Sequence, residues 1–127
     1  MPLVRISLLR GKPSAYRQAI AEAVYQALRD TFDVPDRDRF VTITEHDGED
    51  FIFDRFYLGI DRSDDFVIIQ LTVSNTRTRE KKRALYLRIV ELLAADPGLR
   101  PEDVFINLVE VLPENWSFGM GEAQYVK

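Results

Sequence analysis

An internal repeat with an offset of 65 residues constrains the fold of this sequence more than any other feature. At this offset, residues 38–45 align with residues 103–110, sharing an Asp, a Phe and a Glu and matching in the phase of their apolar positions. The sequence therefore predicts two copies of one unit, at about residues 2–46 and 67–111, within a single domain of residues 1–127. The same offset aligns two further apolar sets, Ile6, Ile20, Val24 and Leu28 with Leu71, Leu85, Ile89 and Leu93.

The first copy is predicted to form a strand, a helix and a second strand. The first strand covers Leu3–Leu9, and Ser14 is expected to cap a helix that runs to about Phe32. The second strand, Phe40–Glu45, alternates apolar and polar residues and is rich in β-branched side chains. The helix carries an apolar stripe at helical spacing, formed by Ile20, Ala23, Val24, Ala27, Leu28 and Phe32.

The second copy repeats this plan. Its first strand is predicted over Phe66–Val73, and Thr78 is expected to cap a helix that runs to about Ala94. A last strand covers Val104–Val111, and residues 116–121 beyond it are interpreted as a small hairpin. The apolar face of the helix is expected to consist of Leu85, Ile89, Leu92 and Leu93.

Each unit should place its two strands parallel in one sheet, because a strand-helix-strand connection is a right-handed crossover. Two units joined by the connector 48–65 and related by a pseudo-twofold axis predict an α/β (α+β) fold. This fold is a four-stranded, mainly parallel sheet with both helices on one face. The other face is left uncovered, so we expect a homo-oligomer to bury it.

Composition excludes several kinds of function. The chain has no cysteine, which excludes disulfides, thiolate metal sites and a cysteine nucleophile. Its one histidine, His46, rules out a paired-histidine metal motif, and it lies in the polar stretch 45–50, which is interpreted as a turn. The net charge of −4 argues against nucleic acid as a partner. No segment approaches the roughly 20 apolar residues that cross a membrane, so we expect a cytoplasmic protein without a membrane partner.

Pro2 follows the initiator methionine and is the first candidate catalytic residue. Removal of Met1 would leave a secondary amine at the head of a strand, where it can act as a base, an acid or a nucleophile. The ordinary pKa of a chain-terminal amine is about 8, and an apolar pocket lowers it by disfavouring the charged form. Taken alone, a Met-Pro start is also common in proteins that make no catalytic use of it.

Three further clusters could carry chemistry. Five of the seven residues from Arg77 to Arg83 are cations at a helix start, which indicates either an anion site or a solvated basic face. Asp38 could hold a terminal amine in its charged form, or it could cap a strand, as its repeat counterpart Asp103 suggests. Trp116 and Phe118 could close an apolar pocket, or they could be core or subunit-contact residues.

These pieces together resemble the tautomerase superfamily, and within it the malonate semialdehyde decarboxylase group. The resemblance covers nearly the whole chain and is carried by Pro2, Arg37-Asp38-Arg39 after Val34-Pro35, the stretch 59–70, and Trp116-Ser117-Phe118-Gly119. It implies that Pro2 is the catalytic amine and Asp38 its carboxylate partner. It also implies that Arg77 binds the substrate carboxylate and that Trp116 and Phe118 form an apolar wall. The decarboxylase group carries two arginines two positions apart before this helix, and an ungapped placement puts them at Ser74 and Thr76. Arg77 and Arg79 have the same spacing further along the chain, so a loop adjustment would be needed to use both.

The resemblance implies an enzyme without metal or cofactor that acts on a small oxo-carboxylate. Two reactions are expected: decarboxylation of the malonate-semialdehyde type, as a lyase, or keto-enol tautomerisation, as an isomerase. The expected assembly is a homotrimer. The alternatives are a non-catalytic trimer that binds a small anionic metabolite or a protein partner, and a hydratase or dehalogenase of unsaturated acids.

Overall fold

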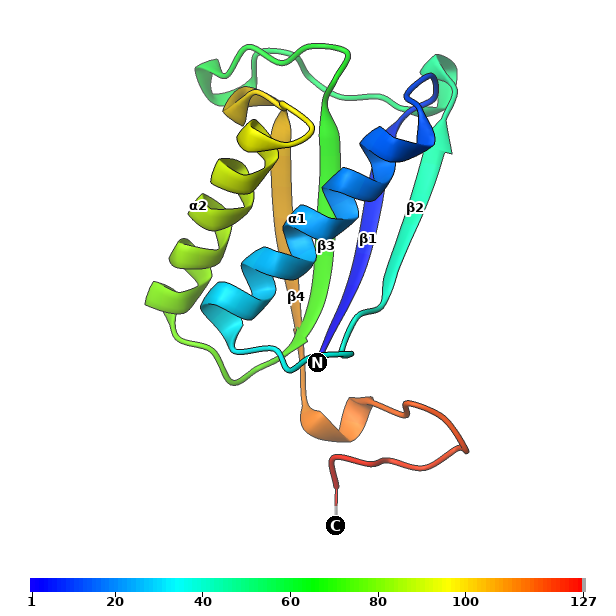
Figure 1. The fold of residues 1–127 in the computed structure, drawn as a ribbon, viewed down its shortest axis with the longest axis vertical. Helices are drawn as coiled ribbons and strands as arrows, with labels where there is room; N and C mark the ends of the chain where they lie inside the picture. The colour runs from blue at the N-terminus through cyan, green and yellow to red at the C-terminus, as the bar shows by residue number, and fades with distance from the viewer. Residues whose placement is uncertain (127) are drawn as a thin grey trace.

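The computed structural model describes residues 1–126, which form a four-stranded sheet with two helices packed on one of its faces (Figure 1). The strands lie in the order β2-β1-β3-β4, with parallel outer pairs and an antiparallel central pair. The expected four-stranded, mainly parallel architecture is therefore confirmed, and the antiparallel centre makes the sheet mixed. Along the chain the elements are β1 (Pro2–Leu9), α1 (Ser14–Phe32), β2 (Val41–His46), β3 (Val67–Ser74), α2 (Arg79–Ala95) and β4 (Val104–Val111).

The strand register repeats with the same offset of 65 residues as the sequence. Val4 pairs with Val41 in the first unit, and Ile69 pairs with Ile106 in the second. At the antiparallel centre, Arg5 pairs with Gln70, its own counterpart at this offset. A pseudo-twofold axis therefore passes between β1 and β3, and the two units begin at opposite ends of the sheet.

The core lies between the sheet and the two helices. Side chains at alternate positions of β1 and β3 point toward the helices and are buried, because successive residues of a strand face opposite sides. All six predicted stripe residues of α1 are buried, whereas Leu92 of α2 is only partly buried. The largest fully buried core side chains include Ile6, Ile20, Leu28, Ile69, Leu71, Leu85, Ile89 and Leu93.

The two helix starts differ in how they are capped. Thr78 caps α2 as expected, because its hydroxyl oxygen accepts a 3.2 Å hydrogen bond from the Lys81 amide. The prediction that Ser14 caps α1 is wrong. Ser14 is the first helical residue, and Pro13 occupies the cap position without a side-chain hydrogen bond. The preceding proline fixes the entry of the chain into the helix, so a hydroxyl cap is not required.

Two assignments outside the helices also need correction. His46 does not lie in a turn but ends β2, where its ring stacks on Phe51 with centroids 5.3 Å apart. Residues 116–121 do not form a hairpin, because the segment after β4 makes a short 3-10 helix (Pro113–Asn115) followed by turns. His46 pairs with Leu9 of β1, and the indole of Trp116 donates a hydrogen bond to Ser74, so contacts from outside each segment help to decide its structure.

The face of the sheet opposite the helices is uncovered, as expected. On β4 the residues of this face, Phe105, Asn107 and Val109, are exposed. On β3 the side chain of Gln70 donates a 3.1 Å hydrogen bond to Asn107 across the same face. In residues 1–126 no helix is both long and apolar enough to cross a membrane.

Candidate active site

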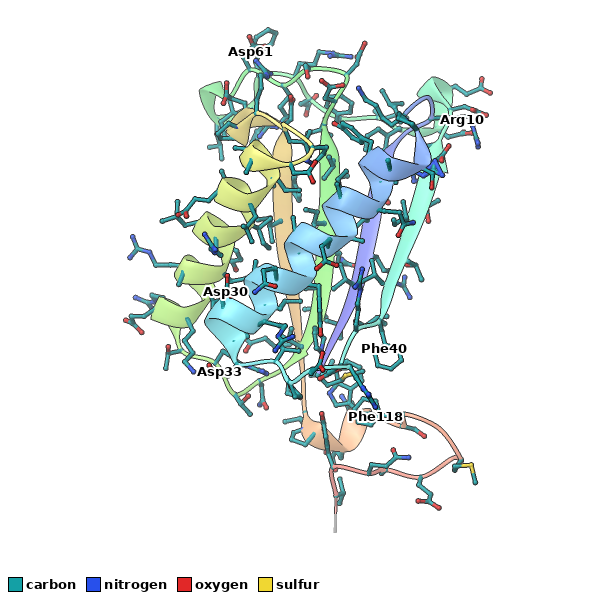
Figure 2. The ribbon with its side chains drawn as sticks, viewed as in Figure 1. Arg10, Asp30, Asp33, Phe40, Asp61 and Phe118 are labelled. Carbon is teal, nitrogen blue, oxygen red and sulfur yellow. The ribbon has the colours of Figure 1, made fainter. Side chains whose placement is uncertain are left out.

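The start of the chain and its final segment meet at one end of the sheet. The N-terminus lies where β1 begins, and the segment after β4 extends past this end of the sheet (Figure 1). Phe40, just before β2, and Phe118, from the final segment, are found at this same end (Figure 2). The parallel pairing of β1 with β2 brings residue 40 beside the N-terminus, since the amide of Val4 donates a 2.9 Å hydrogen bond to the Phe40 carbonyl.

An amine and a carboxylate lie together here. The N-terminal nitrogen of Met1 is 3.8 Å from Oδ2 of Asp38, and both side chains are largely buried. Oδ1 of Asp38 is buried without a hydrogen-bond partner among the described residues. An unpaired oxygen of this kind is costly to bury, which is typical of a group that awaits a ligand or serves a reaction.

Burial shifts the pKa values of both groups toward their neutral forms. Removal from water lowers the pKa of the N-terminal amine, Asp38 acts in the opposite direction, and the charge of Arg77 adds to the lowering. Burial likewise raises the pKa of Asp38, against the lowering effects of the terminal amine and Arg77. The two partners are thus brought closer in proton affinity than free groups are, which suits proton transfer.

A cavity of about 330 Å³ opens beside this pair, and we call it the N-terminal cavity. Its lining combines the amine and the carboxylate with a cation and three aromatic rings. This combination of mostly apolar walls and a few polar groups is typical of a site for a small molecule. The lining residues used below are Met1, Arg37, Asp38, Phe40, Phe118 and Tyr125.

Asp38 and its repeat counterpart Asp103 have opposite surroundings. Asp103 accepts 2.7 Å hydrogen bonds from both the amide and the hydroxyl of Ser63, and a third of 3.1 Å from Nε of Arg100. Burial acts to raise the pKa of Asp103, but the hydrogen bonds from Arg100 and Ser63 hold it below its ordinary value. Asp103 is therefore a structural residue that ties the connector to β4. The repeat does not extend that role to Asp38, which lacks such donors.

The final segment forms an aromatic wall of the N-terminal cavity. Trp116 stacks on Phe118 with centroids 5.4 Å apart, and Phe118 meets the Tyr125 ring edge-on at 4.7 Å. Gln124 closes the segment on itself, since its Oε1 accepts a 3.0 Å hydrogen bond from the Phe118 amide while its Nε2 donates to the Gly119 carbonyl at 2.8 Å. Burial and the charge of Asp38 raise the pKa of Tyr125, and Arg77 opposes them.

Arg77 is not one of the residues that line the N-terminal cavity. Its Nη2 donates a 3.1 Å hydrogen bond to the Phe32 carbonyl, and its guanidinium lies 4.9 Å from the centre of the Phe32 ring. The other cations of the cluster do not gather around one anion site, because Lys81 pairs with Asp33 and Lys82 with Glu110. Arg77 is nevertheless close enough for its charge to act on the pKa values of the terminal amine and Asp38.

The structure thus brings together part of the predicted set. Asp38 and Phe118 line the cavity, and Pro2 follows the residue that carries the terminal amine. Trp116 stacks on Phe118 without lining the cavity, and Arg77 is not among the lining residues. Five further lining residues were not in the predicted set: Pro35, Asp36, Arg37, Phe40 and Tyr125. The first four lie within three residues of Asp38, in or beside the charged loop that the sequence singled out, whereas the position of Tyr125 depends on how the last turns fold. Within residues 1–126, no three His, Asp or Glu side chains gather as a metal site.

Comparison with known proteins supports one family. A model of a family described as tautomerase enzyme matches residues 38–119, and a second model with the same description matches residues 2–56. The chain is 36% identical to the probable tautomerase YusQ of Bacillus subtilis (strain 168), over the full length of both chains.

Two solved structures share both fold and sequence with this chain. The FG41 malonate semialdehyde decarboxylase inhibited by 3-bromopropiolate is 42% identical, with a TM-score of 0.91 over 97% of this chain and 93% of that one. A malonate semialdehyde decarboxylase with decarboxylase and hydratase activities is 31% identical, with a TM-score of 0.90 over 97% and 95% of the two chains.

Proposed function

The chain belongs to the tautomerase superfamily, and from this premise we propose that it is an enzyme that acts on small oxo-carboxylates through the amine of Pro2. The observation that carries the proposal is the terminal amine beside Asp38 in a cavity walled by aromatic rings. Burial lowers the pKa of the terminal amine at this place in the fold, which favours its neutral form.

The catalytic amine belongs to the chain from which Met1 has been removed. While Met1 is present, the nitrogen of Pro2 is an amide and has no basicity, so the Met1 amine stands in for it in the structure. Pro2 is buried at the start of β1 and pairs with Val73 of β3. After removal of Met1, its secondary amine occupies the floor of the N-terminal cavity, held by the two central strands.

Two reactions fit this arrangement. In a tautomerisation, the neutral amine takes a proton from the carbon next to the substrate carbonyl, and the enol oxygen is protonated in turn. In a decarboxylation, the protonated amine polarises the carbonyl oxygen of a 3-oxo acid. The bond to the carboxylate carbon then breaks, its electron pair passes into the enol as carbon dioxide leaves, and a proton adds to the carbon.

The other residues of the predicted set take roles that follow from their positions. Asp38 sets the proton affinity of the amine, and its unpaired Oδ1 is free to accept a hydrogen bond from a substrate hydroxyl or water. Arg77 supplies positive charge that favours a bound carboxylate. Phe118, supported by Trp116, excludes water from the reacting atoms and strengthens these electrostatic interactions.

The relatives support the two reactions to different degrees. The 42% identity to a malonate semialdehyde decarboxylase favours decarboxylation, and the similarity to a probable tautomerase favours isomerisation. Ser74 and Thr76 carry no charge, and Arg77 is the cation of this stretch to which the resemblance assigns the substrate carboxylate. The hydratase activity of a relative makes addition of water to an unsaturated acid the third reaction to assay.

A homotrimer completes the proposal. The sheet face opposite the helices carries apolar side chains such as Val109, which is 38% exposed. Assembly of three chains around the end of this face that carries Val109 would bury that end. Light scattering that gives the mass of a monomer at micromolar concentration would contradict this part of the proposal.

The proposal is tested by covalent labelling and product analysis. Incubation with 3-bromopropiolate should modify one nitrogen per chain, and peptide mass spectrometry should place the adduct on Pro2. Modification elsewhere, or none, would contradict an amine-based enzyme and favour the non-catalytic binder of a small anion. Product analysis with malonate semialdehyde, phenylenolpyruvate and 3-haloacrylates then separates decarboxylase, tautomerase and dehalogenase.

A further inference from the structure

A second cavity of about 260 Å³ lies at the opposite end of the sheet, beneath the connector between the two units. It opens where β3 begins, whereas the N-terminal cavity opens where β1 begins. Figure 2 shows Asp61 of the connector at this end and Phe118 at the other. Its lining includes Phe53, Tyr57, Arg62, Phe66, Ile68 and Phe105.

The second cavity is the repeat counterpart of the N-terminal cavity. At the offset of 65 residues, Phe53 corresponds to Phe118 and Phe105 corresponds to Phe40. The remaining pair is the informative one, because Phe66 corresponds to Met1. The duplication therefore produced two equivalent cavities, and only one of them has a chain terminus at its floor.

The second cavity has lost the groups that the proposed reaction needs. Phe66 is inside the chain, so its backbone nitrogen is an amide with no basicity. Both carboxylate oxygens of Asp103, the counterpart of Asp38, are occupied by Ser63 and Arg100. A binding pocket without the catalytic pair remains.

Arg62 gives this pocket a charge. The residue is only 8% exposed, and its Nη1 donates to the carbonyls of Asp54, Tyr57 and Ile60 at 3.0–3.3 Å. Its guanidinium lies 5.8 Å from the centre of the Phe66 ring. Among residues 1–126, no carboxylate forms a salt bridge with it. A cation buried beside aromatic rings without a counter-ion is costly, and a bound anion would offset that cost.

Two nitrogens of Arg62 are left for such an anion. Within the described part of the chain, Nε and Nη2 of Arg62 have no hydrogen-bond partner. They are also not fully buried, because the buried unpartnered side-chain atoms in that part of the chain are Asp38 Oδ1 and His46 Nε2. Arg62 is one of the lining residues of the cavity, and from this we infer that these two donors face it. An Arg edge with two free donors matches the two oxygens of a carboxylate.

We propose that the second cavity is a non-catalytic binding site for a small carboxylate with an aromatic or branched apolar body. The carboxylate binds the Nε and Nη2 edge of Arg62, and the body packs among Phe53, Phe66 and Phe105. The cavity is near the lower end of the size range of ligand pockets, which restricts the ligand to about one ring. This site is separate from the proposed reaction and does not depend on it.

Benzoate is a suitable probe, with benzamide as its neutral counterpart of the same shape. Titration of the full-length protein, followed by amide NMR shifts, should show benzoate saturating resonances of residues 53–66 and 105. Benzamide should bind there at least about tenfold more weakly, because it lacks the charge that Arg62 recognises. Shifts confined to residues 35–40 and 118–125, or equal affinities for the two probes, would overturn the proposal.

Two variants localise the site. Ile68→Trp fills the cavity from the sheet and should abolish the shifts at residues 53–66, whereas Leu87→Trp, at an exposed site on α2, should leave them unchanged. Arg62→Gln should lower the affinity for benzoate to the affinity for benzamide. If this variant does not fold, Ile68→Trp and the comparison of benzoate with benzamide decide whether the site exists. If residues 53–66 become protected as the protein concentration rises, and benzoate no longer binds, a second copy of the chain occupies the cavity. That result would refute the ligand site. Because the readout is binding at the second cavity, failure of Pro2 labelling leaves the result unaffected.

Discussion

The indole Nε1 of Trp116 donates a 3.1 Å hydrogen bond to Oγ of Ser74, a buried residue at the end of β3. This bond fixes the final segment to the sheet, and Trp116 in turn supports Phe118 in the wall of the N-terminal cavity. The side chain of Ser74 is uncharged. In this chain the position therefore orients the aromatic wall and has no charge to offer a substrate.

Ser74→Ala should loosen that wall. Loss of the hydrogen bond leaves the indole donor unpaired and should cost about 1 kcal/mol of stability. The Michaelis constant for an oxo-carboxylate substrate should rise several-fold, while Ser74→Thr, which keeps a hydroxyl, should restore it. Trp116 is the only tryptophan in the sequence, so a red shift of its fluorescence reports the change directly. An unchanged emission maximum in Ser74→Ala would contradict the role, and Ser7→Ala on β1 is the control.

The repeat and the apolar stripes predicted the fold because they record which side of each element is buried. All six predicted stripe residues of α1 are buried because burial follows helical spacing, whereas the buried residues Ala21 and Tyr25 were not in the predicted stripe. Local signals failed where distant contacts decide. His46 has polar neighbours in sequence, yet it continues β2 and stacks on Phe51, and Trp116 lies in a segment held by Ser74 rather than by a hairpin.

The candidate site was predictable to the extent that single residues carried its chemistry. Asp38 and Phe118 were identified from their motifs and do line the N-terminal cavity. Tyr125 was missed because its position follows from the clamp that Gln124 makes with Phe118 and Gly119, which no pattern encodes. The different roles of Asp38 and Asp103 were also hidden, because identical residues at repeat positions acquire different partners only in the folded chain.

Asp38→Asn and Asp103→Asn should have opposite effects on stability. Asp103→Asn replaces a buried carboxylate that accepts four hydrogen bonds and should cost about 2 kcal/mol of unfolding free energy. Asp38→Asn removes a charge that is buried with one unpaired oxygen and should leave stability unchanged or raise it, while activity is lost. Urea unfolding at pH 7 measures both variants. Destabilisation of equal size in the two would contradict the functional assignment of Asp38.

The pH dependence of these differences follows from the two pKa shifts. Burial raises the pKa of Asp38, so the stability gained from its neutral form is fully present below its unfolded pKa of about 4 and is lost as pH rises through the folded value. Hydrogen bonds hold the pKa of Asp103 below its ordinary value, so its stabilisation is present above about pH 4 and is lost as pH falls through the folded value. Relative to wild type, Asp38→Asn should gain and Asp103→Asn should lose stability as pH rises from 3 to 7. Thermal unfolding across this range checks both slopes.

Arg77→Ala should raise the Michaelis constant by about tenfold or more, equivalent to loss of a charge-assisted hydrogen bond. Arg83 belongs to the same basic cluster but lies six residues further along the chain, and its side chain is exposed. Arg83→Ala should therefore change the Michaelis constant less than twofold, because exposed surface charges contribute little. Steady-state kinetics of the two variants at low and moderate salt makes the comparison. Equal effects would mean that the cluster acts only through its overall charge.

Arg37→Gly should increase stability while it weakens substrate binding. Arg37 occupies the third position of the turn 35–38, which the Asp38 amide closes on the Pro35 carbonyl, and its φ of 69° favours glycine. Relief of that conformation should stabilise the fold by roughly 0.5–1 kcal/mol. The side chain lines the N-terminal cavity, where it can meet a substrate carboxylate, so its loss should raise the Michaelis constant several-fold with little change in kcat. Arg39→Gln is the matched control, since Arg39 pairs with Glu22 instead. A kinetic loss as large in Arg39→Gln, or none in Arg37→Gly, would exclude Arg37 from the binding site.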